Sequence, residues 1–145
     1  MEYSQRRGAF VISLDFELHW GFFDRRRLDD ETKRLLRGAR DAVERLLDLF
    51  VEREIHATWA AVGLLFPPNR AERERLLPDV LPGYANAAID PYREEVGEGE
   101  EDDPYHYAPS LIERIVSSPG QELASHTYGH YYCLEEGQDE RSFEA

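Results

Sequence analysis

The fold of this chain is constrained most by a nearly continuous apolar run over residues 9–14, which ends in Asp15-Phe16-Glu17. Such a run is typical of a strand buried on both faces of a parallel sheet. The carboxyl ends of these strands are where α/β proteins gather ligands and catalytic groups. Since strand side chains alternate, Asp15, Glu17 and His19 share one face if the extended conformation continues. In the alternative interpretation, Asp15 only caps the following loop.

The segments that follow predict an α/β fold with three parallel strands. Apolar residues recur at helical spacing between Leu35 and Phe50, and Asp29 or Asp30 can cap the start of this helix. Residues 55–63 then return as a second strand, which gives a right-handed β-α-β unit. Further along, we expect two short helices and a third strand, at residues 71–77, 109–117 and 122–125. The carboxyl ends of the three strands should carry Asp15, Gly63 and His126.

A pair of histidines near the end of the chain points to a metal site. His126 and His130 are four residues apart and follow a short apolar run, so both imidazoles can lie on one side of a tight turn. Such a pair is a common half of a zinc site, which a carboxylate from elsewhere completes. In the alternative interpretation, one histidine caps a turn and the other is solvated. The acidic end of the first strand favours a divalent metal, with zinc as the best match and cobalt or nickel as further candidates.

Three segments, in their order along the chain, resemble motifs of the polysaccharide deacetylase family. The members of this family are metal-dependent carbohydrate esterases with a distorted (β/α) barrel. The first is Ser13-Leu14-Asp15-Phe16-Glu17, similar to the family's strand that ends in an Asp-containing turn. The second, residues 57–63, is similar to its Ala-Thr-Phe-Phe-x-x-Gly strand. The third is His126-Thr127-Tyr128-Gly129-His130, which matches every defined position of the metal motif His-(Ser/Thr)-x-x-His.

The resemblance implies a partial distorted (β/α) barrel with parallel strands, a divalent metal and a carbohydrate substrate. The implied reaction removes N-acetyl groups from a surface polysaccharide or its precursor, and His126 and His130 are the implied metal ligands. The family's first motif usually has two adjacent aspartates, a base followed by a metal ligand, but Phe16 stands at the second position here. Two assignments therefore stay open. Either Glu17 is the ligand and Asp15 the base, or Asp15 is on the metal.

The family's later motifs have no counterpart in this chain. They are an Arg-containing strand end, an Asp-Trp pair and a Leu-x-His whose histidine resembles a general acid. His19 and His106 are the unassigned histidines near the expected site, and neither matches a family position. We therefore expect residues 1–145 to be the N-terminal part of such a domain, either as an enzyme or as a truncated, inert relative that binds metal and sugar. Half a barrel leaves two sheet edges unpaired, which predicts self-association into a homo-oligomer or poor stability alone.

Residues 78–107 interrupt the pattern as a long acidic loop or insertion. Proline and glycine break any long element here, and residues 94–103 contain seven acidic side chains. Loops of this length are often associated with substrate. The tyrosines of the loop either stack on sugar rings or fasten the loop to the body, and we expect the second role. They are Tyr84, Tyr92, Tyr105 and Tyr107.

Composition argues against several classes of partner. The formal net charge of −13 repels phosphates, so we expect no nucleic-acid binding. No apolar run approaches the roughly 20 residues that span a bilayer. Met1 to Gly8 is polar, so we expect no signal peptide, and the single cysteine, Cys133, excludes an intrachain disulfide. These features together predict a cytoplasmic protein.

Overall fold

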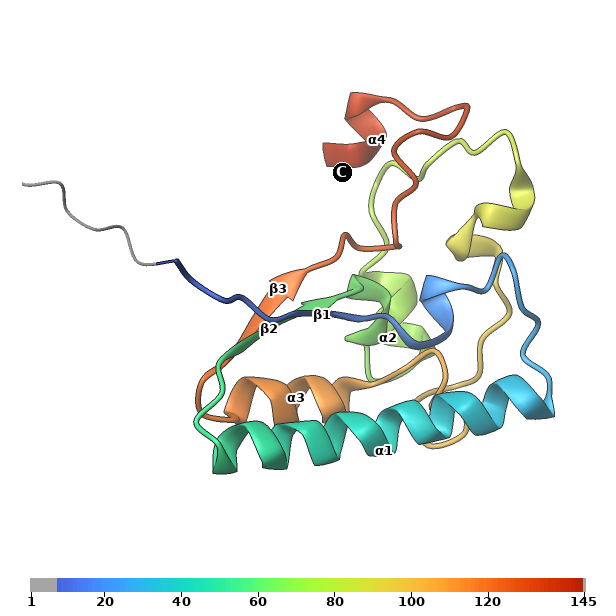
Figure 1. Ribbon diagram of the computed structural model, residues 1–145. Helices are drawn as coiled ribbons and strands as arrows, with labels where there is room; N and C mark the ends of the chain where they lie inside the picture. Colours follow the sequence, from blue (N-terminus) through green and yellow to red (C-terminus); the bar gives the residue numbers. More distant parts are fainter. Residues whose placement is uncertain (1–7, 145) are drawn as a thin grey trace, which may run out of the picture.

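Three parallel strands form the centre of the structure, a computed structural model that describes residues 8–144. They are β1 (Ser13–Phe16), β2 (Ala57–Ala61) and β3 (Gln121–Ser125), hydrogen-bonded in the order β1-β2-β3 (Figure 1). The predicted α/β class and the parallel pairing are confirmed. The sheet is small and open, and the described residues do not form a barrel. The segment Met1 to Gly8, where we expect no signal peptide, lies outside the described residues except for Gly8.

Four α-helices and four short 3-10 helices accompany the sheet within the described residues. The α-helices are α1 (Asp30–Glu52), α2 (Arg70–Arg75), α3 (Pro109–Ser117) and α4 (Glu140–Glu144). The 3-10 helices are η1 (Leu18–Gly21), η2 (Gly63–Leu65), η3 (Ala87–Ile89) and η4 (Pro91–Arg93). The two short helices expected from the sequence correspond to α2 and α3. None of the helices in residues 8–144 has the length and apolar character needed to cross a membrane.

The predicted long helix is α1, and a side-chain cap sets its start. The Asp29 carboxylate accepts a hydrogen bond from the Thr32 N–H at 2.8 Å. Asp30 and Glu31 add negative charge to the first turn, where the helix dipole favours it. The apolar residues of α1 recur on one face and are buried there, namely Leu36, Val43, Leu47 and Phe50. Helical spacing therefore predicts both this element and the face that it buries.

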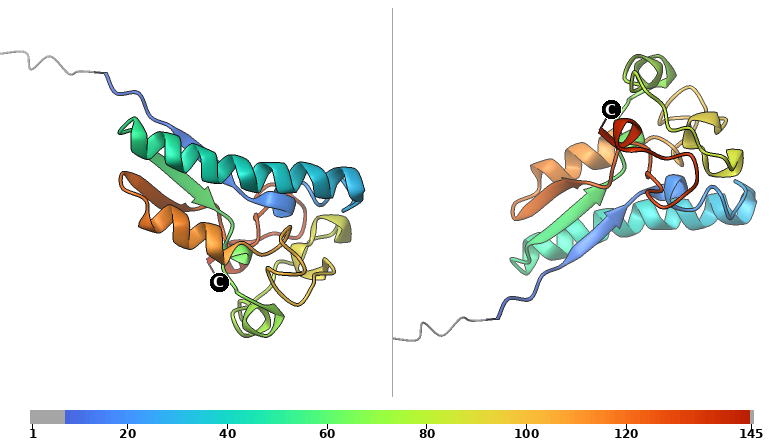
Figure 2. Two further views of the ribbon diagram at one scale, coloured as in Figure 1. Left: turned by 90° about the horizontal axis from the view of Figure 1, so that it is seen from below. Right: turned by 90° about the horizontal axis from the view of Figure 1, so that it is seen from above.

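Helices α1 and α3 lie side by side on one face of the sheet (Figure 2). Alternate residues of β2 point toward them and are buried, namely Ala57, Trp59 and Ala61. Trp59 packs on Phe50 of α1 with ring centroids 6.3 Å apart. The two residues between them in β2, Thr58 and Ala60, are only partly buried. The core of the protein therefore lies between the sheet and these two helices.

The prediction that residues 9–14 are buried on both faces of the sheet is wrong. Strand β1 begins at Ser13, and the preceding Phe10 and Val11 are 91% and 74% exposed. Both crossovers place their helix on the same side, so no helix of the described residues covers the opposite face along the strands (Figure 2). A continuous apolar run alone does not reveal which face the helices will cover.

The register of the sheet sets the three carboxyl ends level with one another. Phe16 of β1 lies opposite Ala61 of β2, and Ala61 lies opposite Ser125 of β3. The Val62 N–H continues this edge by donating to the Phe16 carbonyl at 3.1 Å. The His126 N–H does the same with the Ala61 carbonyl at 2.9 Å. The residues that follow β1 and β3 are therefore delivered to one end of the sheet.

The loop at residues 78–107 is held against the body by its own side chains. Three of its four tyrosines are buried, namely Tyr84, Tyr105 and Tyr107, as expected for a fastening role. Its acidic side chains are engaged as well. The Asp102 carboxylate accepts hydrogen bonds from the Glu98 and Gly99 N–H groups, each at 3.0 Å. The acidic run therefore organises the backbone of the loop rather than being uniformly solvated.

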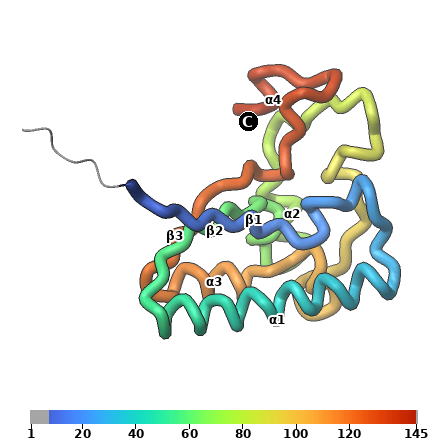
Figure 3. The backbone as a smooth tube through the Cα atoms, in the orientation of Figure 1, coloured from blue at the N-terminus to red at the C-terminus, as the bar shows by residue number. Residues whose placement is uncertain are grey.

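The segment after β3 runs beside the start of this loop (Figure 3). The Tyr132 N–H donates a hydrogen bond to the Tyr84 hydroxyl at 3.1 Å. The Ala85 N–H donates to the Glu136 carbonyl at 3.0 Å. These contacts join the loop to the part of the chain that carries His130.

Candidate metal centre

Glu17 follows β1 at the point where the chain leaves the extended conformation. Its φ and ψ are −136° and −17°, and η1 begins at the next residue. The alternation expected of a strand therefore stops at Phe16, and the prediction that His19 shares a face with Asp15 and Glu17 is wrong. His19 is buried, with 1% of its surface exposed, whereas Asp15 is exposed on β1.

His126 and His130 lie on the tight loop that follows β3. The backbone of this loop is left-handed at Thr127, with φ of 61°, and at His130, with φ of 54°. Such a conformation costs a non-glycine residue roughly 1–2 kcal/mol. Local hydrogen bonds support it: the Thr127 N–H donates to Ser125 Oγ at 3.1 Å, and Thr127 Oγ1 accepts from the Tyr131 N–H at 2.7 Å. The loop is therefore a specific structure and not a simple continuation of the strand.

Gly63 anchors the same loop to the end of β2. The Gly63 N–H donates to the Thr127 carbonyl at 3.0 Å, and the Leu64 N–H donates to the Tyr128 carbonyl at 2.8 Å. A Cβ on Gly63 would lie 2.5 Å from the Tyr128 ring and 2.9 Å from its Cα. Because the second of these atoms belongs to the backbone, a larger residue would push the histidine loop away. The glycine of the second motif thus positions the histidines of the third.

Glu17, His126 and His130 converge on one point at the carboxyl edge of the sheet. The Nε2 atoms of His126 and His130 lie 3.3 Å and 3.1 Å from the same oxygen, Oε2 of Glu17. One ligand atom from each of the three side chains lies within 4.8 Å of the other two. In a tetrahedral zinc site, ligand atoms about 2.1 Å from the ion are roughly 3.4 Å apart, so these side chains fit a shared ion. Asp15 does not belong to this group.

The electrostatics of the centre favour an ionised carboxylate. The hydrogen bond from His130 lowers the pKa of Glu17 below its ordinary value, and the charges of His130 and His126 act in the same direction, whereas partial burial opposes them. The three side chains remain 21–32% exposed, which leaves room for water or substrate. His130 Nδ1 is buried without a hydrogen-bond partner among the described residues, so its ring lacks the acceptor that most metal-bound histidines have.

Comparisons of this chain with protein-family models, with curated proteins and with solved structures found no significant match. The functional interpretation of the centre therefore depends on its geometry.

Gly21 determines whether Glu17 can reach the histidines. A Cβ at residue 21 would overlap the Glu17 carboxyl group and lie 2.6 Å from its Cγ. Since the Glu17 side chain must then turn away, we expect Gly21→Ala to weaken zinc binding by about 10–100-fold while the fold is retained. Isothermal titration calorimetry measures the affinity. Gly38→Ala on α1 is the matched control, because a Cβ there meets nothing within 4 Å. Unchanged affinity in Gly21→Ala would show that Glu17 is not a ligand.

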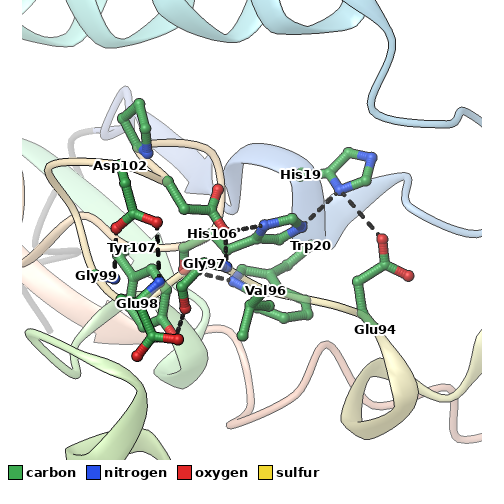
Figure 4. A network of polar contacts seen from close by, with 12 residues as sticks. His19, Trp20, Glu94, Val96, Gly97, Glu98, Gly99, Asp102, His106 and Tyr107 are labelled. Carbon is green, nitrogen blue, oxygen red and sulfur yellow. Dashed lines mark hydrogen bonds and ion pairs between the residues drawn. The ribbon is translucent and has the colours of Figure 1, made fainter.

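A second pair of histidines, to which no sequence motif assigns a role, lies between η1 and the acidic loop. His19 and His106 are each 1% exposed, and their rings contact each other (Figure 4). Burial lowers the pKa of His19, although its hydrogen bond to the Arg26 carbonyl opposes this shift. The one sequence signal for this pair is the spacing Asp103-x-x-His106, in which a carboxylate can meet an imidazole three residues later. The pairing of two histidines 87 residues apart has no local signal.

Proposed function

We propose that this chain is a metal-dependent hydrolase of the polysaccharide deacetylase type, which removes N-acetyl groups from a carbohydrate. The observation that carries the proposal is the convergence of Glu17, His126 and His130 at the carboxyl edge of a parallel sheet. Two imidazoles and one carboxylate are the protein ligands of many catalytic zinc sites, which keep a position open for water or substrate. Zinc is the best match to this set, and cobalt or nickel would suit the same ligands.

The arrangement of the strands supports the same proposal. The order β1-β2-β3 follows the chain, and both crossover helices, α1 and α3, lie on one face of the sheet (Figure 2). Doubly wound sheets have helices on both faces, whereas a barrel keeps all of its helices outside. We therefore propose that the described residues are part of a distorted (β/α) barrel, with the metal centre on its catalytic face.

In this proposal Glu17 is a metal ligand and Asp15 is the general base. Glu17 contacts both histidines, whereas Asp15 is exposed two residues earlier. A divalent ion at the centre would lower the pKa of a bound water and polarise the acetyl carbonyl. Asp15 takes the proton of the attacking water. The water oxygen bonds to the amide carbon, and the C–N bond breaks when the amide nitrogen takes up a proton from a general acid, so that acetate and the sugar amine leave.

The placement of the histidines favours a second candidate, a metal- and sugar-binding relative without turnover. Release of the amine from an amide requires a general acid. The chain has five histidines, and all of them lie in the described residues. His126 and His130 are at the centre, His19 and His106 are buried together, and His56 is exposed before β2. No histidine is left to protonate the leaving amine.

The two candidates differ in whether they cleave an amide, which needs a general acid, and an activated ester serves as a test of the metal and the base alone. A hydrolase with its own acid releases acetate from an N-acetylated chitooligosaccharide. A chain with metal and base but no acid hydrolyses an activated ester such as 4-nitrophenyl acetate, because nitrophenolate leaves without a proton. Acetate release and nitrophenolate absorbance, measured with zinc and with a chelator, separate these cases. If zinc supports hydrolysis of neither substrate, the hydrolase proposal is overturned and the metal- and sugar-binding protein remains as the candidate.

We also propose that the free edges of β1 and β3 associate into a homo-oligomer. Within the described residues each of these strands is paired on one side only, and unpaired edges tend to bind other strands. At micromolar concentration, sedimentation velocity should show species heavier than the 16.9 kDa chain. Val11→Lys beside β1 should reduce association, whereas Val116→Lys on the exposed face of α3 should not. A monomer that melts cooperatively at this concentration would contradict the proposal.

A further inference from the structure

Two buried histidines, one from η1 and one from the acidic loop, meet a carboxylate that is not part of the metal centre described above. His19 Nδ1 lies 2.8 Å from His106 Nε2 and 3.9 Å from Oε1 of Glu94 (Figure 4). Glu94 follows η4, so three separate segments of the chain meet here. Both imidazoles are 1% exposed, whereas the Glu94 side chain is 31% exposed. The cluster is therefore closed on the histidine side and open to ions on the carboxylate side.

In each imidazole, the nitrogen that points away from the other ring (the outer nitrogen) lies within hydrogen-bond distance of an acceptor. His106 Nδ1 lies 2.8 Å from Oδ2 of Asp103, and His19 Nε2 lies 3.0 Å from the Arg26 carbonyl oxygen. The same Asp103 oxygen also accepts a hydrogen bond from the Gly97 N–H at 2.7 Å. A carboxylate and a carbonyl can only accept hydrogen bonds, so both outer nitrogens carry a hydrogen.

The two inner nitrogens, Nδ1 of His19 and Nε2 of His106, therefore point their lone pairs at each other. In a neutral imidazole with one N–H, the other nitrogen is an acceptor. Two acceptors 2.8 Å apart repel each other unless a cation, either a proton or a metal ion, lies between them. The nearby Glu94 oxygen supplies negative charge on the same side. The arrangement therefore requires a cation between these two nitrogens.

We propose that His19, His106 and Glu94 form a second site for a divalent transition-metal ion, with zinc as the ion that best suits these ligands. One ligand atom from each of the three lies within 4.8 Å of the others. Metal-bound histidines almost always donate their other N–H to a carboxylate or a backbone carbonyl, and both such partners are in place here. Binding requires the facing nitrogens to separate from 2.8 Å to roughly 3.4 Å, the spacing in a tetrahedral site.

An ion at this site would join the acidic loop to η1, two residues from Glu17. The His19 N–H already donates to the Tyr105 carbonyl at 3.2 Å, and Trp20 Nε1 donates to the His106 carbonyl at 3.0 Å. A metal would add a direct link between the side chains of the same two segments. The site therefore has a structural role, and it is separate from the centre at Glu17, His126 and His130.

The test uses the double variant His126→Ala/His130→Ala, which lacks the ligands of the other centre. The metal-free protein is titrated with cobalt and then with zinc. Cobalt at the second site should quench the fluorescence of Trp20, whose ring centroid is 4.8 Å from that of His106, and zinc should displace it. We expect one equivalent of metal per chain in the double variant. The wild type should bind two if both sites exist, or one if the other centre does not bind.

A variant of Glu94, the partly exposed ligand, distinguishes a bound metal ion from a shared proton between the two imidazoles. In the double-variant background, Glu94→Gln keeps the shape of the side chain and should weaken cobalt and zinc binding at least about tenfold. The exposed neighbour provides the control, since Glu95→Gln should leave affinity unchanged. Absence of stoichiometric metal in the double variant would overturn the proposal and show that a proton holds the two imidazoles together. Unchanged affinity in Glu94→Gln would overturn it as well.

Discussion

Replacing His126 by alanine is expected to weaken zinc binding at the first centre by about two to three powers of ten. Structural zinc sites bind with about 10–16 kcal/mol from four ligands, so one lost ligand corresponds to roughly 2.5–4 kcal/mol. His126 is one of three protein ligands here, and its Nε2 lies 3.3 Å from the Glu17 carboxylate oxygen.

Calorimetry with zinc measures this loss most cleanly in a chain that also carries Glu94→Gln, which weakens the second proposed site. The matched control is His56→Ala, because His56 is exposed at the opposite end of the sheet. Zinc affinity in the control should equal that of the parent chain. If His126→Ala binds zinc as tightly as the control, the assignment of this centre fails.

Replacing Asp15 by asparagine should leave zinc affinity within a factor of about three while lowering zinc-dependent ester hydrolysis by about 10²–10⁴-fold. The amide side chain keeps the shape of Asp15 but cannot accept a proton from water. Asp15 is exposed and does not contact the histidines, so its loss should not disturb the ligands. The initial rate with 4-nitrophenyl acetate measures the effect, and this ester requires no general acid.

Glu17→Gln provides the opposite pattern in the same assay. It removes the anionic ligand that contacts both histidines, so zinc affinity and activity should fall together. Asp41→Asn on the exposed face of α1 is the control for a lost surface charge. Should Asp15→Asn lose zinc while Glu17→Gln retains it, the two roles must be exchanged.

Most of the secondary structure could be predicted from local patterns. Apolar spacing between Leu35 and Phe50 predicts α1, and Asp29 marks its start, because a 3.6-residue period leaves one face to bury. A helix between two apolar runs favours a parallel pair of strands, because parallel neighbours need a crossover of about this length. The burial of β1 is an exception, because a short apolar run is compatible with burial on one face or on two and does not distinguish them.

The sequence by itself determined that His126 and His130 would lie beside an acidic strand end, since carboxyl ends of parallel strands meet at one edge of a sheet. Only the tertiary structure decided that Glu17, rather than Asp15, contacts the histidines. That choice depends on where the extended conformation stops and on the space above Gly21. The same holds for the pairing of His19 with His106, which arises from segments 87 residues apart. Periodicity reports the face that each element buries, but contacts between loops depend on packing that no local pattern encodes.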